Sequence, residues 1–418
     1  MMMDDFVASA RAFLDGAAER RHDSARAWGS GSDRVTYFSD DVPDVAAEKV
    51  QAGRAWQRRR WEAGFGWITG PAEYGGAGLT TLHQLAYDTV EAEYDVPDTG
   101  VLSVIGLGMI GPTILTHGTP AIRDRYLAAM YRGEVIACQL FSEPGAGSDL
   151  AGVETRAVRD GDSWRLDGQK VWTSVAQHAD IGMALCRTDP DQPKHRGITA
   201  FLLDLRAPGV EVRPLRQMSG GAEFNEVFLT DVVVSDDHRL GDVGNGWRVA
   251  LTTLMNERAT VGGGQSPVAG ALSLPYLVGL LKSQGRDQDP AARRALAEFY
   301  ATYAATGYLN RQARRRLESG EHPGPEASVS KLMYARNLTR GAHLAAEIAG
   351  PKLVADTGEW GTFAWTELLL SVPALRILGG TEEIMMNILA ERVLGLPKEP
   401  GVDPNTPFRE LKRAGGAA

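Results

Sequence analysis

Cysteine is scarce in this sequence of 418 residues, which contains only Cys138 and Cys186. Two such cysteines cannot form a disulfide framework, a CxxC redox pair or a cysteine-rich zinc site. Long apolar runs are also missing, because none reaches the roughly 18 to 20 residues that a membrane-spanning helix needs. The amino end lacks the basic stretch that opens a signal peptide. We therefore expect a cytoplasmic protein without membrane insertion.

Positive charge is in the minority, with 44 Lys and Arg against 53 Asp and Glu, so the net charge is −9. An acidic surface is a poor match for nucleic acid or for an anionic membrane. The sequence also has no GxSxG, HExxH or P-loop motif, and its eight histidines show no metal-ligand spacing. These absences disfavour nucleic-acid binding, hydrolase chemistry and metal-dependent chemistry, and we expect no metal site.

What the sequence does contain is three stretches of different texture. Residues 1–133 show apolar positions every three or four residues, which predicts a helical domain. Residues 134–240 predict short strands separated by turns, which is typical of a small barrel or sandwich. Helical periodicity returns over residues 241–397, and the tail 398–418 is expected to be loosely ordered. We therefore predict an α+β fold with an N-terminal helical domain, a central small β-barrel and a C-terminal helical bundle.

Seven strands are predicted in the central stretch, and none alternates with a helix, which disfavours a Rossmann domain. They cover Val135–Phe141, Val153–Arg159, Ser163–Val171, Asp180–Thr188, Gly197–Asp204, Val210–Leu215 and Asn225–Val234.

Two segments of the predicted barrel carry residue types that suit a flat, phosphate-bearing ligand. Residues 141–149 form a Gly-rich loop after a strand, and its N–H groups could meet a phosphate or a flavin edge. A simple turn is the more common explanation of such a loop. Residues 170–174 end a strand with an aromatic ring and two hydroxyls. Trp172 there is ordinarily a core residue, and the functional alternative is a ring packed on a cofactor ring.

Two helical segments carry carboxylates with a similar ambiguity. Thr381 followed by Glu382 and Glu383 is a typical helix start, yet the N–H groups of such a terminus can also bind an anion or a carbonyl oxygen. Glu257 beside Arg258 lies in an apolar helical stretch, where a surface charge pair is the usual interpretation and a catalytic carboxylate is the alternative.

In this order, these segments resemble the acyl-CoA dehydrogenase family, over about residues 60 to 397. The motifs that carry the resemblance are residues 141–149, 168–174, 224–228, 246–250 and 380–384. The resemblance implies noncovalently bound FAD and oxidation of an acyl-CoA thioester to its trans-2-enoyl form. It also implies an electron-transfer flavoprotein as the electron acceptor. An acyl-CoA oxidase on the same scaffold, or a non-catalytic partner subunit of a mixed oligomer, remains an alternative.

The family motifs imply a set of cofactor and substrate contacts, position by position. Backbone groups of Leu140, Phe141 and Ser142 would meet the flavin edge, and Ser148 would lie near the pyrophosphate or the pantetheine arm of the substrate. The remaining contacts implied are Trp172, Thr173 and Ser174 at the flavin ring, Thr381 and Glu383 on the nucleotide side of FAD, and Arg258 on the substrate side.

The position of the catalytic base departs from the commoner family pattern. Most members carry a glutamate directly before the Gly-Thr pair, and Gly379 stands there in this sequence. Isovaleryl-type and long-chain-type members place the base on another helix, just before an arginine, which Glu257 matches. The resemblance therefore implies Glu257 as the base. It also implies the N–H of Gly379 as a donor to the thioester oxygen, since glycine keeps its backbone N–H.

Two further segments depart where the family binds FAD across a subunit boundary. Residues 285–290 stand in place of an Arg-x-x-Phe-Gly motif, and residues 347–351 in place of Gln-x-x-Gly-Gly. Arg286 is a weak substitute candidate. The sequence thus leaves open a homo-oligomer, dimeric or tetrameric, or a mixed oligomer with a related chain, and it does not fix the acyl group.

Overall fold

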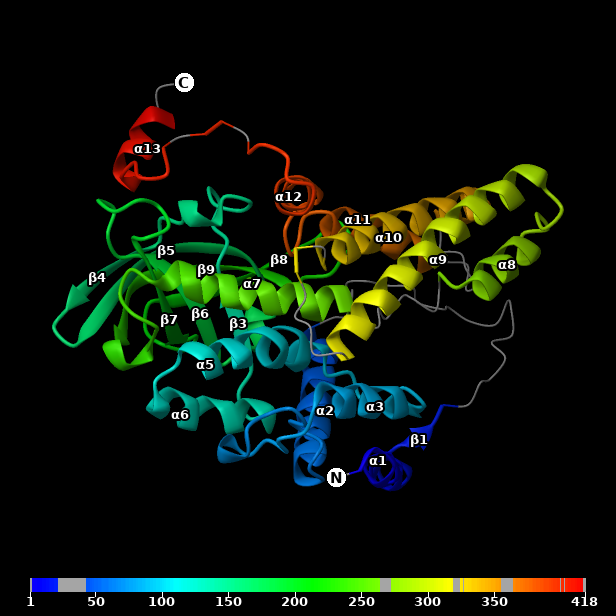
Figure 1. Cartoon of the computed structure of the whole chain (residues 1–418), viewed down its shortest axis with the longest axis horizontal. Coiled ribbons are helices and arrows are strands. Elements are labelled where there is room, and N and C mark those ends of the chain that lie inside the picture. Colours follow the sequence, from blue (N-terminus) through cyan, green and yellow to red (C-terminus); the bar gives the residue numbers. More distant parts are fainter. Residues whose placement is uncertain are drawn as a thin grey trace.

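The computed structural model describes residues 2–21, 43–263, 272–318, 324–325, 327–354, 364–398, 400–401 and 403–415. Figure 1 shows an N-terminal group of helices at the bottom, a sheet at the left and a bundle of long helices at the right. Helix α7 (Gly246–Gly263) crosses the middle of the molecule between them. The predicted order of helices, strands and helices is confirmed.

The N-terminal layer buries a stripe of apolar side chains along its helices. In α1 these are Phe6, Ala10 and Leu14, at the spacing of one helix face. Helix α6 begins where Thr119 caps it by accepting a hydrogen bond from the Ile122 N–H (3.3 Å). The elements are α1 (Met3–Ala17), α2 (Pro43–Glu62), α3 (Thr81–Glu91), α4 (Gly100–Leu102), α5 (Gly111–His117) and α6 (Pro120–Tyr131), with β1 (Glu19–Arg20) paired antiparallel to β2 (Tyr94–Asp95).

The central strands form one eight-stranded sheet, in the order β10-β7-β6-β4-β5-β9-β8, with β3 paired in parallel to β6. Every residue of β6 is buried, as expected for a strand at the centre of a core. The strands are β3 (Ala137–Leu140), β4 (Arg156–Asp160), β5 (Ser163–Ser174), β6 (Ile181–Arg187), β7 (Ile198–Asp204), β8 (Val210–Leu215), β9 (Phe224–Ser235) and β10 (Arg239–Leu240). All seven predicted strands are present within a few residues of their expected bounds, and the short β10 was not predicted.

The C-terminal bundle is organised around α10, which contacts α7, α8, α9, α11 and α12. Its buried positions Ala335, Leu338 and Ala342 share one helix face, and they pack against Trp365 and Leu277 from neighbouring helices. The helices are α8 (Leu274–Ser283), α9 (Pro290–Glu318), α10 (Ala327–Ala349), α11 (Ala364–Leu375) and α12 (Glu382–Ile388).

The segment that ends the chain packs on the sheet domain, contrary to the expectation of a loosely ordered tail. It contains α13 (Phe408–Gly415). The N–H of Phe408 donates to the carbonyl of Gln192 and that of Arg409 to Pro190, both at 3.0 Å. The Phe408 ring also lies 3.9 Å from the Arg187 guanidinium. One aromatic anchor and two backbone bonds therefore hold this segment in place, which the sequence pattern did not reveal.

Candidate active site

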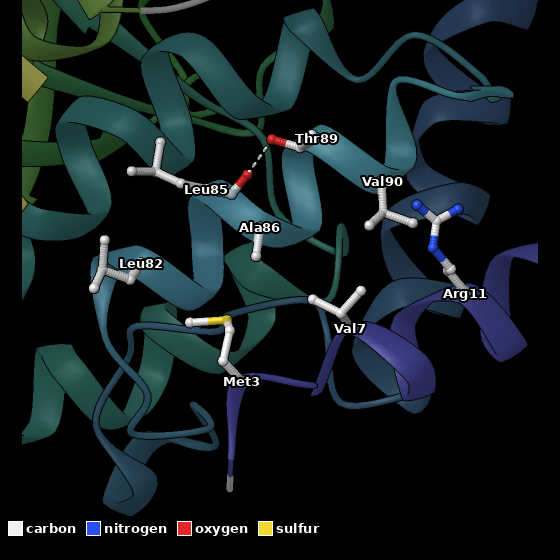
Figure 2. A pocket seen from close by; sticks show the side chains of 8 residues that line it. All are labelled: Met3, Val7, Arg11, Leu82, Leu85, Ala86, Thr89 and Val90. Atoms are coloured by element: carbon white, nitrogen blue, oxygen red, sulfur yellow. Dashed lines mark hydrogen bonds between the residues drawn. The ribbon is translucent and has the colours of Figure 1, made fainter. Parts of the chain in front are cut away.

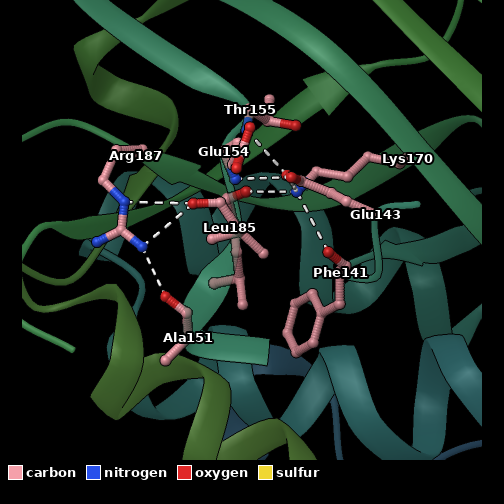
Figure 3. Close-up of polar contacts among 9 residues, drawn as sticks. Phe141, Glu143, Ala151, Glu154, Thr155, Lys170, Leu185 and Arg187 are labelled. Carbon is pink, nitrogen blue, oxygen red and sulfur yellow. Dashed lines mark hydrogen bonds and ion pairs between the residues drawn. The ribbon is translucent and has the colours of Figure 1, made fainter. Parts of the chain in front are cut away.

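A buried ion pair between Lys170 and Glu143 anchors the first residues of the Gly-rich loop 141–149 (Figure 3). Lys170 on β5 is fully buried, and its ammonium donates to Glu143 Oε1 (2.7 Å), the Phe141 carbonyl (3.2 Å) and the Leu185 carbonyl (2.7 Å). The Glu143 carboxylate also accepts the N–H groups of Glu154 (2.6 Å) and Thr155 (2.9 Å). All three ammonium donors and both carboxylate oxygens thus have partners, as a buried pair requires.

The electrostatics of this pair keep Glu143 ionised. Burial by itself raises the pKa of the carboxyl, but the Lys170 cation and the hydrogen-bond donors outweigh it, and the net pKa is lowered. Arg187 fixes the residues that follow the loop, because its guanidinium donates to the carbonyls of Ala151 (2.6 Å) and Val153 (3.1 and 3.2 Å). The loop is therefore rigidly anchored at both ends.

The groups that this loop can offer a ligand are mainly amide N–H groups. The carbonyls of Phe141 and Ser142 already accept hydrogen bonds from Lys170 and from the Val171 N–H (2.9 Å). The side chain of Leu140 is buried, so this residue can contribute only backbone atoms. Ser148 is exposed. Apart from the glycine itself and its two chain neighbours, no residue has an atom within 4 Å of the point where a Cβ on Gly145 or Gly147 would stand, so a ligand has room there.

The end of β5 presents an aromatic ring next to this loop. A register shift between Lys170 and Thr173 gives Trp172 a φ of 59°, and its side chain is 62% exposed. A positive φ is costly for a bulky residue and is typical of functional positions. Thr173, the next residue, is buried, and its hydroxyl has no hydrogen-bond partner in the described structure. Ser174 is half-buried and pairs with Phe224 on β9.

These features fit a flavin. A large exposed indole beside open backbone N–H groups offers a flat apolar face with polar atoms at its edge, which is what a flavin ring requires. The unpartnered Thr173 hydroxyl is a further polar group that a ligand could satisfy.

The second group of predicted residues lies on the C-terminal helices, where Glu257 and Gly379 come together. Glu257, half-buried, projects from α7, and Gly379 lies in the turn between α11 and α12. A Cβ built on Gly379 would lie 3.1 Å from Glu257 Oε1. The two residues that the resemblance implies at the reaction site therefore lie side by side. Gly379 has a φ of 67°, which favours glycine.

The start of α12 carries the predicted N-cap, and its two carboxylates lie in different surroundings. The Thr381 hydroxyl accepts the Ile384 N–H (3.2 Å), so the predicted N-cap is confirmed. Glu382 is buried against Arg376 (3.0 Å) and Arg336 (3.4 Å). Glu383 is exposed, and its pKa is lowered by its own backbone N–H and the Thr381 hydroxyl. Glu383 thus stays accessible to a ligand, whereas Glu382 has a structural role.

Two of the remaining predicted residues give less support to a ligand role. The Arg258 backbone lies in α7, but its side chain is outside the described residues. Arg286 uses Nε and Nη2 on the Asp289 carboxylate (3.2 and 2.7 Å) and Nη1 on the Glu347 carbonyl (2.6 Å). Because all three nitrogens are engaged locally, Arg286 is a poor substitute for the cross-subunit FAD contact.

Sequence reasoning missed Lys331, which lies beside Gly379. This lysine on α10 is 2% exposed, and its Cε lies 3.7 Å from the same Cβ position on Gly379. The missed signal is periodicity: Lys331 shares a helix face with the apolar positions Ala335 and Leu338. A charged residue in such a stripe is buried, and a buried lysine needs partners.

Two cavities lie elsewhere, and none of the predicted cofactor or substrate contacts lines them. One, of about 360 Å³, lies between α1 and α3 and is lined mainly by apolar side chains such as Val7 and Leu85 (Figure 2). The other, of about 790 Å³, lies between the sheet and the C-terminal segment and includes Arg156 and Phe408. Among the described residues, no three His, Cys, Asp or Glu side chains group closely enough to hold a metal ion. In the same part of the chain no helix is both long and apolar enough to cross a bilayer.

Comparison with known families gives three adjoining matches. The models of the N-terminal, middle and C-terminal domains of acyl-CoA dehydrogenases match residues 34–134, 138–232 and 244–394, respectively.

Individual relatives agree with these matches. The acyl-CoA dehydrogenase IpdE1 of Mycobacterium tuberculosis is 39% identical over 85% of this chain and 91% of its own length. The acyl-CoA dehydrogenase FadE34 of the same organism is 43% identical over 78% of this chain, which spans only 44% of that relative. A solved structure described as "Tcur3481-Tcur3483 steroid ACAD" superposes with a TM-score of 0.75 at 25% identity, covering 95% of this chain and 98% of the other.

Proposed function

This chain belongs to the acyl-CoA dehydrogenase family of FAD-dependent oxidoreductases that desaturate acyl-CoA thioesters, and we propose that Glu257 is its catalytic base. The observation that carries the proposal is the distance of 3.1 Å between Glu257 Oε1 and the Cβ position on Gly379. A glutamate at residue 379 would start from that point. This distance supports Glu257, on α7, as a substitute for the carboxylate that most family members carry at this position.

Different residues of the chain have different roles in the proposed reaction. Glu257 takes the α-proton of the thioester, and the N–H of Gly379 donates a hydrogen bond to the thioester carbonyl oxygen, where negative charge develops. Bound FAD supplies the oxidant that accepts the β-hydrogen as hydride. Trp172, Ser174 and the N–H groups of Phe141 and Ser142 would hold the flavin ring, with the Thr173 hydroxyl beside it. Thr381 and Glu383 would lie at its nucleotide side, and Ser148 and Arg258 would contact the substrate.

The test of this proposal is Glu257→Gln, which keeps the shape of the side chain and removes its basicity. FAD content and binding of an acyl-CoA should match those of the wild type. The rate of anaerobic flavin reduction should fall by roughly 10²–10⁴, the usual worth of a positioned base. A panel of short, branched, long and steroid-like acyl-CoAs should be screened first on the wild type. Flavin reduction at the wild-type rate in the variant would place the base elsewhere.

We further propose that the protein works as an oligomer, and that a second dehydrogenase-like chain completes its FAD site. Both segments that would contact FAD across a subunit boundary are altered, and Arg286 is engaged with Asp289 and Glu347. The similar solved structure "Tcur3481-Tcur3483 steroid ACAD" is named after two proteins. A homotetramer with full FAD occupancy in light scattering would contradict the mixed assembly. An electron-transfer flavoprotein as acceptor and a cytoplasmic location stay predictions from the sequence.

A further inference from the structure

The buried lysine on α10 lies against the turn that carries Gly379. Its ammonium donates to the carbonyl oxygens of Gly380 (2.5 Å) and Leu375 (3.3 Å). Removing an ammonium group from water is costly unless hydrogen bonds and opposite charge compensate it. Lys331 therefore has a role beyond filling space.

The two acceptors of Lys331 lie on either side of Gly379 along the chain. Leu375 is the last residue of α11, where free carbonyls and the helix dipole favour a cation. Gly380 directly precedes Thr381, the N-cap of α12. Lys331 thus ties the end of one helix to the start of the next. The turn between them, including the N–H of Gly379, is fixed as a result.

The same lysine is coupled to the carboxylate proposed as the base. The Glu257 Oε1 atom and the Lys331 Cε atom lie 3.1 and 3.7 Å from one point, the Cβ position on Gly379. Burial lowers the pKa of Lys331, and Glu257 is the strongest influence in the opposite direction, followed by Glu382 and Glu383. Electrostatic coupling is reciprocal, so the Lys331 cation favours the ionised form of Glu257.

Other charged groups lie near Lys331, and most of them have partners of their own. Glu382 on α12 is paired with Arg336 on α10 and with Arg376 after α11, and Glu383 on α12 faces solvent. Arg258 follows Glu257 on α7, with its side chain outside the described residues. Among the described carboxylates, Glu257 therefore has the strongest electrostatic effect on Lys331.

We propose that Lys331 is a positioning residue for the dehydrogenation: it fixes the Gly379–Gly380 turn toward the thioester oxygen and holds Glu257 in its ionised form. This inference rests on the proposed role of Glu257 as the base. A neutral residue at position 331 would let Glu257 keep its proton to a higher pH, because a nearby cation no longer opposes protonation. The Gly379 N–H would also be held less firmly.

The experiment compares Lys331→Met, Lys331→Arg and Arg340→Met as purified holoenzymes. Arg340 is exposed on the same helix and serves as the matched control. Anaerobic flavin reduction by a good acyl-CoA is followed against pH, together with thermal unfolding and FAD content. In Lys331→Met the pH midpoint of the rising limb should move up by about one unit or more. The rate at pH 7 should fall at least about tenfold. Lys331→Arg should keep the wild-type midpoint at a lower rate, and Arg340→Met should change neither.

The outcomes separate this inference from the proposed base. If Lys331→Met lowers the unfolding temperature but leaves the pH midpoint unchanged, Lys331 is a structural residue only and the inference is overturned. If Lys331→Met does not fold, Lys331→Arg decides the question. An upward shift of its pH midpoint by about one unit would overturn the inference, because the arginine keeps the positive charge. Glu257→Gln, measured in parallel, decides the base independently. If Glu257→Gln loses activity but the Lys331 variants show no shift of the pH midpoint, only the role of Lys331 is rejected.

Discussion

Two lysines are buried in the described part of the chain, Lys170 and Lys331; both lie next to loops that we expect to contact ligands, and their surroundings differ. Lys170 in the sheet domain forms a closed pair with Glu143, in which every polar atom has a partner inside the protein. Lys331 in the helical bundle donates to two carbonyls. Its Cε atom and the Glu257 Oε1 atom lie 3.7 and 3.1 Å from the Cβ position on Gly379. Both hold a loop in place. Only Lys331 lies near the carboxylate that we propose as the base.

From this difference we expect Lys170 to serve the architecture and Lys331 to serve the proposed chemistry. A closed pair contributes rigidity, and removing one partner leaves an uncompensated buried charge. A buried lysine beside a proposed catalytic carboxylate is expected instead to favour the ionised form of that carboxylate. The same kind of side chain therefore gives different effects when it is changed: loss of stability in the sheet domain and a shifted pH dependence in the bundle.

The largest expected effect on stability is that of Lys170→Met. The variant leaves the Glu143 carboxylate buried without its counter-charge, which should lower the free energy of unfolding by about 3–5 kcal/mol. Denaturant unfolding of the FAD-free protein measures this directly. Lys194→Met is the matched control, because Lys194 pairs with Asp149 at 2.7 Å on the surface. It should cost less than about 1 kcal/mol. Equal effects of the two variants would break the distinction between the closed pair and an ordinary surface pair.

The acid dependence of stability gives a second test of the closed pair. The pKa of Glu143 is lowered in the folded protein, so its contribution is present above its ordinary pKa and is lost as the pH falls through the folded value. Glu143→Gln should be less stable at neutral pH and should lose less stability on acidification than the wild type. Urea unfolding at pH values from about 3 to 7 measures this slope. Identical slopes in the two proteins would mean that Glu143 does not contribute to the acid response.

Much of the architecture could be predicted from the sequence, whereas the links between distant residues could not. The seven strands follow from local alternation and turn residues, which are nearest-neighbour signals. The Thr381 cap is likewise local. The contact between α7 and the turn at Gly379 joins positions more than a hundred residues apart, so the place of Glu257 came from resemblance and not from spacing. Lys331 was visible as a charge in an apolar stripe, but its acceptors are backbone carbonyls, which no sequence pattern identifies.

Two neighbouring residues on β5 sharpen the comparison further, because one is exposed and the other buried. Trp172→Ala should leave the unfolding free energy of the FAD-free protein within about 0.5 kcal/mol, since the side chain is 62% exposed. FAD affinity should fall by about 1–3 kcal/mol through lost ring packing. Isothermal titration of the FAD-free protein with FAD measures this change. Unchanged affinity would count against the ring contact.

Thr173→Val is the companion variant. The Thr173 hydroxyl is buried without a partner in the described structure, so its removal should not destabilise the FAD-free protein. If FAD satisfies this hydroxyl, the same change should weaken FAD binding by about 1 kcal/mol. Equal FAD affinity in the variant and the wild type would show that the hydroxyl is not part of the cofactor site.

The smallest expected effect uses the space beside Lys331 and Glu257. In the Glu257→Gln background, Gly379→Glu returns a carboxylate to the commoner family position. The backbone opposes it, because a φ of 67° is unfavourable for any residue with a Cβ, and that Cβ would lie 3.1 Å from an oxygen of residue 257. We therefore expect flavin reduction to recover by at most about tenfold over the single variant. Gly379→Gln in the same background is the control and should recover nothing, since it has the same size and strain but no basic group. Equal rates in the two double variants would contradict the expectation that a carboxylate on residue 379 can reach the α-proton.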